Sequence, residues 1–213
     1  MKKFILISIL SCLATQTYAC LEQDFKQELI QDLYTIGAVK TGDFKLKSGE
    51  KSPIYIDLRL VMSHPKVLKK IAYAISSQVH RNDYDIICGV PYGALAFALA
   101  TSLETNKPLI MPRKEVKNYG TQKRIDGNYT QGNRCLVIED VVTTGDSTVA
   151  IAEILKEEKL IVSKIVAIVD RGGTKSLRKK GYDVVSLFTL EEIIDAKPIW
   201  PSSITNTLKN LDC

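Results

Sequence analysis

The chain has 213 residues, of which 45% are hydrophobic and 25% are charged. This composition is that of an ordinary globular protein and excludes a disordered, collagen-like or multi-spanning membrane protein, and the length suits about one domain. The 29 lysines and arginines against 24 aspartates and glutamates leave a net charge of +5, too small a surplus to indicate nucleic-acid binding by itself. Five cysteines without a CxxC pair, and only two histidines, favour neither a zinc site nor a disulfide scaffold.

The first twenty residues have the pattern of a secretory signal. Two lysines precede an apolar run at residues 4–13, which is too short to span a bilayer, so we expect no stable membrane anchor. Small residues at Thr17 and Ala19 suit a cleavage site after Ala19. A non-cleaved extension ahead of a domain that begins near Leu21 would have the same appearance.

The first part of the domain combines helical and strand-like spacing. Apolar residues three and four apart predict an amphipathic helix from Glu22 to Ile36, which Gly37 ends. Alternation and turn residues then predict short strands at residues 40–49 and 52–59. Because proline suits the first position of a helix, Pro65 predicts the start of a second one, which runs to about residue 80.

Further along, short uninterrupted apolar runs alternate with helix-like segments. The runs lie at residues 85–90, 108–111, 135–138, 165–169 and 184–188, and the helix-like segments lie at 94–103, 148–156 and 176–180. Such alternation is typical of buried parallel strands. The predicted fold class is α/β, a parallel central sheet with helices on both faces. Since no repeat or Pro/Gly-rich linker interrupts the chain, residues 21–213 are predicted to form one domain.

One long segment lacks apolar periodicity. It runs from Arg113 to Asn133, and a polar stretch of this length in a compact domain indicates a functional or disordered loop. Its first part, Arg113 to Arg124, holds five cations and one acid, a local charge of +4. A basic loop of this kind can close on a diphosphate, exclude water and stabilise departing negative charge. A solvated charged surface is the alternative.

The strongest chemical signal is the sequence Val-Ile-Glu-Asp-Val-Val-Thr-Thr-Gly-Asp-Ser-Thr at residues 137–148. An apolar strand ends in Glu139 and Asp140, a hydroxyl-rich turn with one glycine follows, and a helix begins. Backbone N–H groups of residues 143–147 would bind a phosphate monoester, and the two acids would meet ribose hydroxyls or hydrated Mg²⁺. A capped helix with solvated acids is the alternative. The motif is no P-loop, because Gly-Lys-Ser/Thr is missing.

This stretch resembles the phosphoribosyl diphosphate motif of type I phosphoribosyltransferases. Other segments extend the resemblance from about Phe25 to Leu190 and narrow it to the orotate phosphoribosyltransferase family. The resemblance implies that orotate and phosphoribosyl diphosphate are converted to orotidine 5′-phosphate and diphosphate in pyrimidine (UMP) biosynthesis. It also implies Mg²⁺ as cofactor, held through substrate and water near Asp140 rather than by direct protein ligands. A homodimer, in which the loop of one subunit completes the neighbouring site, follows from the same resemblance.

The orotate side of the resemblance begins at residues 42–57, which are similar to the family's small hood at about residues 40–60. It implies that Lys47 contacts the orotate or diphosphate region and that Tyr55 and Ile56 form an apolar wall over the pyrimidine. A lysine in a solvated turn is the alternative for Lys47.

Two further residues complete the implied orotate site. Arg171, in the sequence Val-Asp-Arg-Gly-Gly, would pair with the orotate carboxylate, which the planar guanidinium suits, and Thr143 would lie beside the same substrate. A structural ion pair between Asp170 and Arg171 is the alternative.

The diphosphate side includes residues 89–95, which resemble the family's diphosphate-binding turn. Gly93 departs from the bacterial pattern, which usually has lysine there, so a cationic contact is lost while a backbone N–H remains. The resemblance assigns phosphoribosyl diphosphate binding to Tyr92, Gly93, Arg113, Lys114, Lys117, Tyr119, Glu139, Asp140, Val141, Val142, Thr143, Thr144, Gly145, Asp146 and Ser147.

Three of these residues, Lys117, Arg113 and Asp140, are the candidate catalytic residues, and Lys117 is the main one. Tyr119 stands where many relatives have histidine, and its ordinary pKa of ~10 makes it a hydrogen-bond donor rather than a proton shuttle at neutral pH.

Two other functions share this fold. A purine-type phosphoribosyltransferase is disfavoured by the hood with Lys47 and by Arg171. A nucleotide-sensing regulator that binds RNA or DNA is disfavoured by the modest charge and the lack of a helix-turn-helix extension, so we expect no nucleic-acid partner. Because the sugar diphosphate is a cytosolic metabolite, we expect a cytoplasmic location, with export through residues 1–20 as the alternative.

Overall fold

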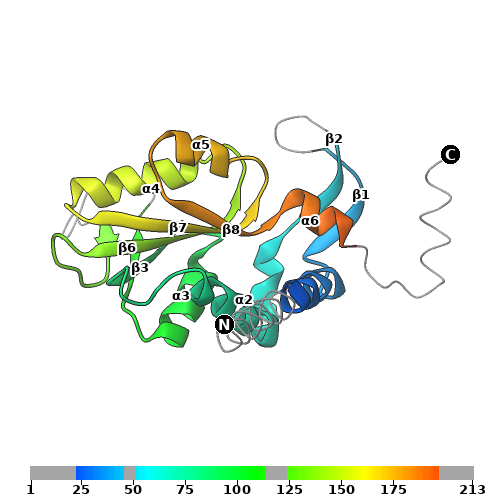
Figure 1. Ribbon diagram of the computed structural model, residues 1–213, viewed down its shortest axis with the longest axis horizontal. Coiled ribbons are helices and arrows are strands. Elements are labelled where there is room, and N and C mark those ends of the chain that lie inside the picture. The colour runs from blue at the N-terminus through cyan, green and yellow to red at the C-terminus, as the bar shows by residue number, and fades with distance from the viewer. Residues whose placement is uncertain (1–22, 46–50, 114–123, 197–213) are drawn as a thin grey trace, which may run out of the picture.

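The computed structural model describes residues 23–45, 51–113 and 124–196. A six-stranded sheet in the order β5-β4-β3-β6-β7-β8 forms its centre (Figure 1). All neighbours in this sheet run parallel except β5, which is antiparallel to β4. The strands are β3 (Ile86–Gly89), β4 (Leu109–Pro112), β5 (Ile125–Asp126), β6 (Arg134–Val142), β7 (Ile161–Asp170) and β8 (Val184–Thr189).

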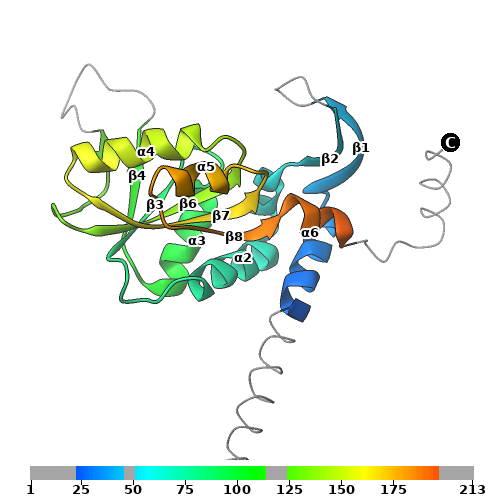
Figure 2. The same ribbon diagram turned by 45° about the horizontal axis from the view of Figure 1, so that its top comes forward.

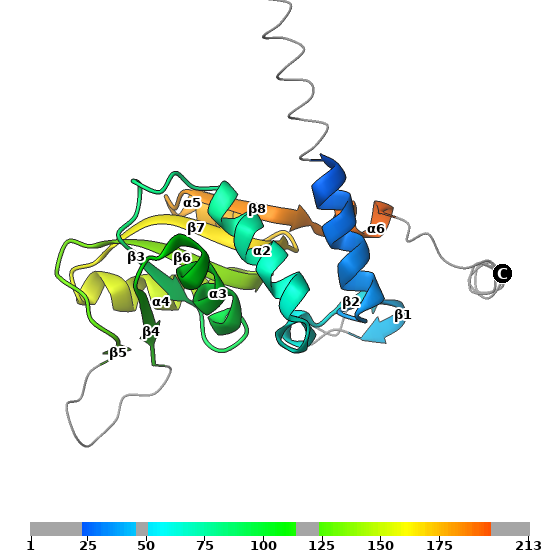
Figure 3. The same cartoon turned by 90° about the horizontal axis from the view of Figure 1, so that it is seen from below.

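Helices cover both faces of this sheet, as Figures 1 and 3 show. One face carries α2 (Pro65–Ser77) and α3 (Leu95–Thr105), and the other carries α4 (Asp146–Glu157) and α5 (Thr174–Lys179). All four residues of β3 are buried, which explains why the strands have no polar alternation. The predicted α/β class, the parallel sheet and the helix start at Pro65 are therefore confirmed.

A small second unit lies at one end of the sheet (Figure 2). It contains the antiparallel pair β1 (Val39–Lys45) and β2 (Lys51–Ile56), a helix over residues 23–35, and the final helix α6 (Leu190–Asp195). The Tyr34 hydroxyl donates a hydrogen bond to the Ile193 carbonyl at 2.9 Å, which joins the first of these helices to the last. From β2 the chain enters the 3₁₀ helix η1 (Leu58–Ser63), which leads into α2.

Two short elements differ from the sequence prediction. The segment predicted to lack regular structure up to Asn133 contains β5, where Ile125 is fully buried, because one buried residue in a two-residue strand leaves no periodicity to detect. The helix α6 was not predicted either. Its signal was the capping box formed by Thr189 and Glu192, whose side chains each accept a hydrogen bond from the other residue's backbone N–H.

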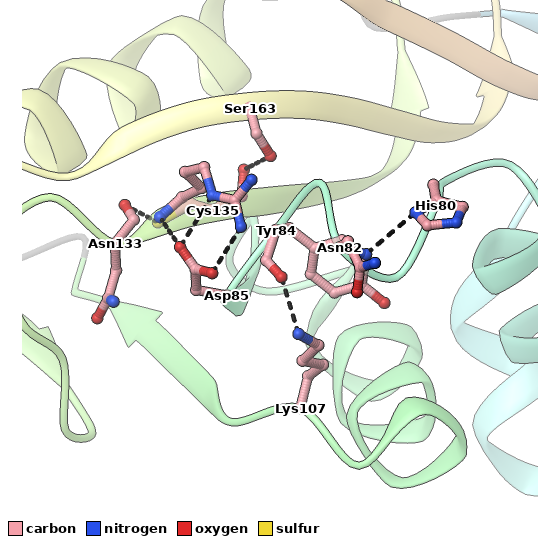
Figure 4. Close-up of polar contacts among 9 residues, drawn as sticks. His80, Asn82, Tyr84, Asp85, Lys107, Asn133, Cys135 and Ser163 are labelled. Carbon is pink, nitrogen blue, oxygen red and sulfur yellow. Dashed lines mark hydrogen bonds and ion pairs between the residues drawn. The ribbon is translucent and has the colours of Figure 1, made fainter.

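Polar contacts close the end of the sheet where β3 and β6 begin (Figure 4). The Arg134 backbone N–H donates to Asp85 Oδ2 at 2.9 Å, its Nη2 donates to Oδ1 at 2.8 Å, and the Asp85 N–H donates to the Arg134 carbonyl at 2.8 Å. Nearby, Lys107 Nζ donates to the Tyr84 carbonyl at 2.9 Å. The parallel strands end at the opposite end of the sheet, and the loops that the sequence predicts to bind substrate follow them there. Within the described residues, no helix has the length and apolarity needed to cross a membrane.

Candidate active site

The predicted phosphate turn connects the end of β6 to the start of α4. Gly145 has a φ of +84°, a left-handed conformation that favours glycine, and a Cβ there would lie 2.9 Å from the Leu177 side chain of α5. The hydroxyl of Thr144 donates to Asp146 Oδ2 at 2.8 Å, and both Thr143 and Thr144 are exposed. The strand, turn and helix therefore follow one another as the sequence predicts, with the first backbone N–H groups of α4 beside an exposed turn.

The turn between β7 and α5 lies against this phosphate turn. The Arg171 backbone N–H donates to the Val142 carbonyl at 2.8 Å, which places Arg171 beside it. The Asp170 carboxylate accepts hydrogen bonds from the Gly172 and Thr174 backbone N–H groups at 2.8 and 3.2 Å and from the Thr174 hydroxyl. Asp170 thus orders its own turn and the start of α5. Its carboxylate forms these hydrogen bonds instead of the structural ion pair with Arg171 that was the alternative reading of the sequence.

The adjacent acids Glu139 and Asp140 lie in different environments. Glu139 is only 5% exposed, and the Thr148 hydroxyl of α4 donates to its Oε2 at 2.8 Å. Burial raises the pKa of Glu139 to about 8, against the opposing effect of the Thr148 hydrogen bond, and Asp140 adds to the rise. Asp140 is half-buried, and its Oδ1 accepts the Val141 N–H at 2.8 Å. The two carboxylates interact, because a side-chain hydrogen bond and the charge of Asp140 both contribute to the raised pKa of Glu139.

Asp140 lines a cavity of about 400 Å³ at this end of the sheet. Its walls come from three segments: the end of β2 with η1, the turn after β3, and the end of β6. The lining residues are Ile56, Asp57, Leu58, Arg59, Tyr92, Gly93, Asp140 and Val141.

Gly93 is closely matched to Asp140 within that cavity. A Cβ at position 93 would lie 1.9 Å from Asp140 Oδ2, so no other residue fits while the carboxylate keeps this position. The Asp140 carboxylate therefore fills the space beside the backbone that the side chain of a lysine at position 93 would enter.

The hood residues Tyr55 and Ile56 lie at the end of β2. Ile56 lines the cavity, whereas Tyr55 is 37% exposed and its ring packs beside Phe44 with the centroids 5.5 Å apart. The role of Tyr55 and Ile56 as an apolar wall over the pyrimidine stays a prediction.

Comparison with known proteins agrees with this geometry. The sequence signature of the phosphoribosyl transferase domain matches residues 61–199, which include the phosphate turn and the turn after β7. An orotate phosphoribosyltransferase of Caenorhabditis elegans is 41% identical over 172 residues, covering 79% of this chain and 76% of the relative. The chain belongs to the orotate phosphoribosyltransferase family.

Other members of the orotate phosphoribosyltransferase family support the assignment. The protein of Pyrococcus horikoshii is 40% identical over 178 residues, which cover 82% of this chain and 96% of the relative. The crystal structure of orotate phosphoribosyltransferase from Aeropyrum pernix superimposes with a TM-score of 0.71 at 32% identity, covering 78% of this chain and 96% of that one. The family resemblance and the fold it implies are thereby confirmed.

The basic residues that the family resemblance assigned are only partly described. Arg113 lies directly after β4, and its guanidinium forms an ion pair with Asp126 of β5. The predictions for Lys47, Lys114, Lys117 and Tyr119 lie outside the described residues and stay predictions. The sequence analysis did not predict Asp57 and Arg59 as site residues, although both line the cavity. Their position at the end of the predicted hood segment could have indicated them.

Proposed function

We propose that this chain is an orotate phosphoribosyltransferase, which converts orotate and 5-phospho-α-D-ribose 1-diphosphate to orotidine 5′-phosphate and diphosphate in pyrimidine (UMP) biosynthesis. Its membership of the orotate phosphoribosyltransferase family carries the proposal, with 41% identity to the Caenorhabditis elegans relative over most of both chains. The exposed turn between β6 and α4 also supports the proposal, because a turn at the start of a helix can bind a phosphate group.

In this proposal the turn at residues 143–147 binds the 5′-phosphate through backbone N–H groups and hydroxyls. Asp140 accepts hydrogen bonds from the ribose hydroxyls. Glu139 holds the start of α4 through Thr148 and contributes to the same ribose site. Arg171 pairs with the orotate carboxylate, with Thr143 beside the ring.

The reaction breaks the bond between ribose C1 and the diphosphate oxygen and forms a bond between C1 and the orotate ring nitrogen, whose proton passes to the diphosphate or to water. Positive charge develops on the sugar and negative charge on the leaving diphosphate, so the protein acts by positioning and by neutralising charge. Lys117, with Arg113 and Lys114, stabilises the departing diphosphate.

Mg²⁺ is proposed as the cofactor. Within the described residues, no three or more histidine, cysteine or acidic side chains lie together as a possible metal site. Of the two carboxylates in the cavity, Asp57 is paired with Arg59, which leaves Asp140 to accept hydrogen bonds from water on a hydrated ion. When bound, Mg²⁺ neutralises diphosphate and hydroxyl oxygens of the substrate.

A homodimer is proposed as the working form. Leu99 and Leu103, one turn apart on α3, are 51% and 77% exposed, and an apolar strip of this kind suits burial against a second copy. Sedimentation equilibrium tests it: a mass of twice 23.7 kDa is expected, and a monomer at assay concentration would contradict it.

The cytoplasm is the proposed location. Cys88 and Cys135 are free thiols, and unpaired cysteines are more common in a reducing compartment. N-terminal sequencing of the native protein tests this, because a mature chain that begins at Cys20 or Leu21 in a non-cytosolic fraction would indicate export.

An orotate-dependent diphosphate-release assay with and without Mg²⁺ tests the proposed function. Release is expected with orotate and Mg²⁺ and not with adenine, hypoxanthine or guanine. Turnover of a purine without turnover of orotate would favour the purine-type enzyme. Tight RNA binding at physiological salt, without diphosphate release, would favour the regulator.

A further inference from the structure

Arg59 stands in the cavity beside the residues assigned to substrate, although the sequence motifs gave it no role. Its side chain is 63% exposed, and it lines the cavity with Tyr92, Gly93 and Asp140. Among the described residues of that lining it carries the only positive charge. Gly93 contributes no side-chain charge to the same wall.

Asp57 fixes the orientation of the Arg59 guanidinium. Arg59 Nε lies 2.7 Å from Asp57 Oδ1, and Nη2 lies 3.0 Å from Oδ2, the two-point geometry that arginine forms with a carboxylate. The Arg59 backbone N–H also donates to Asp57 Oδ1 at 3.3 Å, so both ends of the residue are tied to one acid. A preoriented guanidinium loses less conformational entropy when it binds an anion.

The ion pair leaves most of the guanidinium available. Arginine has about five N–H donors, and Asp57 accepts from two nitrogens, so roughly three donors remain for a ligand in the cavity. Hydrogen bonds to Asp57 and, at longer range, the charge of Asp140 raise the pKa of Arg59, which stays a cation at every pH of interest. The group is therefore a fixed positive charge with open donors.

We propose that Arg59 binds the diphosphate of phosphoribosyl diphosphate and supplies the positive charge that a lysine at position 93 would otherwise bring. The proposal rests on the proposed function, because it takes the sugar diphosphate as the ligand of this cavity. If Asp140 binds the ribose hydroxyls, the diphosphate on C1 of the same ribose lies within the reach of a side chain that lines the same 400 Å³ space. Arginine matches the paired oxygens of a phosphate group.

The orotate carboxylate is the other anion that a guanidinium would accept. Arg171 is the assigned partner of that carboxylate, and it lies with the β7–α5 turn rather than in the lining of this cavity. Tyr92 and Gly93, which share the cavity with Arg59, belong to the turn assigned to diphosphate. The position of Arg59 thus favours the diphosphate.

Calorimetric titration with diphosphate and with phosphoribosyl diphosphate, both with Mg²⁺ and without orotate, tests the proposal. Arg59→Gln should weaken both affinities by about 10- to 100-fold, because a charge-assisted contact is lost. Arg59→Lys should restore part of the affinity, since it keeps the charge without the planar fork. Arg81→Gln is the matched control, because Arg81 is exposed in the connection between α2 and β3, before the strand begins, and its affinities should equal those of the wild type.

Steady-state kinetics separates the two anions. In Arg59→Gln the KM for phosphoribosyl diphosphate should rise while the KM for orotate at saturating cosubstrate changes by less than about twofold. An orotate KM that rises alone, or a diphosphate affinity within about twofold of the wild type in a folded variant, would overturn the proposal. A wild-type protein that binds phosphoribosyl diphosphate but does not use orotate would refute the proposed function and leave the role of Arg59 standing.

Discussion

Gly173 lies against the backbone of Thr143 with no room for a side chain between them. A Cβ at position 173 would be 2.6 Å from the Thr143 carbonyl oxygen and 2.8 Å from its carbonyl carbon. The φ of −81° and ψ of −21° at Gly173 are values that any residue adopts, so glycine is needed here for space and not for conformation. The turn after β7 therefore sets the position of the phosphate turn after β6.

Gly173→Ala should weaken the binding of phosphoribosyl diphosphate by about tenfold or more, because the added methyl group pushes Thr143 away from its place and small displacements at a binding site are costly. Titration with phosphoribosyl diphosphate measures the effect. Gly172→Ala is the control, since a Cβ at position 172 meets nothing within 4 Å although its φ is +96°. That control should cost about 1–2 kcal/mol of stability through backbone strain and leave the affinity unchanged. Equal affinities for both variants would contradict the steric explanation.

The buried carboxyl of Glu139 should make the protein less stable as the pH rises. Its pKa is raised from the usual 4.5 to about 8 by burial, so between these values the folded state keeps a proton that the unfolded state has released. The free energy of unfolding therefore falls as the pH increases from about 4.5 towards 8.

Glu139→Gln removes this titration and should flatten the decline, as measured by urea denaturation at several pH values. Thr148→Val should extend the decline to higher pH, because the Thr148 hydrogen bond lowers the pKa that burial raises. Parallel curves for the wild type and Glu139→Gln would show that another group is responsible.

At acidic pH the ion pair between Asp85 and Arg134, rather than Glu139, should determine how the free energy of unfolding changes with pH. Hydrogen bonds from the Arg134 side chain and backbone lower the pKa of Asp85 from 3.8 to about 2, so its stabilisation is complete above pH 3.8 and is lost as the pH falls towards 2. Both side chains are more than a third exposed, so we expect Asp85→Asn to cost only about 1 kcal/mol near neutral pH.

Thermal melts from pH 2 to pH 7 measure the contribution of Asp85. The difference between the wild type and Asp85→Asn should shrink below pH 3.8, and activity at neutral pH should be unchanged because the pair lies where β3 and β6 begin. Asp183→Asn is a comparison variant, since its partner Lys164 is 3.2 Å away without a second contact. A difference that persists unchanged at pH 2 would contradict the linkage.

Lys117→Ala tests the catalytic role that the family resemblance assigns to the basic loop. Loss of a charge that stabilises the departing diphosphate should lower turnover by about a thousandfold and leave the melting temperature unaltered. Single-turnover diphosphate release measures it. Lys123→Ala, a neutralisation in the same segment without an assigned role, should have a much smaller effect. Near-wild-type turnover in Lys117→Ala would refute the assignment.

The sequence by itself determined the architecture and the chemical class of the site. Short uninterrupted apolar runs that alternate with helix-like segments indicate strands buried on both faces, so the parallel sheet and its helices followed from local spacing. The motif at residues 137–148 placed an acid pair and a phosphate turn at a strand end, because the order strand, turn and helix is itself local information. A helix start at Pro65 and a glycine at the left-handed position 145 are decided in the same way.

Tertiary structure decided which of those residues share a space. Whether Glu139 or Asp140 faces the cavity depends on the side of the sheet on which α4 packs, which no local pattern specifies. By sequence alone, glycine at position 93 removes a cationic contact. In the fold, a Cβ at this position would lie 1.9 Å from the carboxylate of Asp140, a residue 47 positions further along the chain. Arg59 gained a role for the same reason: the cavity joins segments distant in sequence, and only folding brings their side chains together.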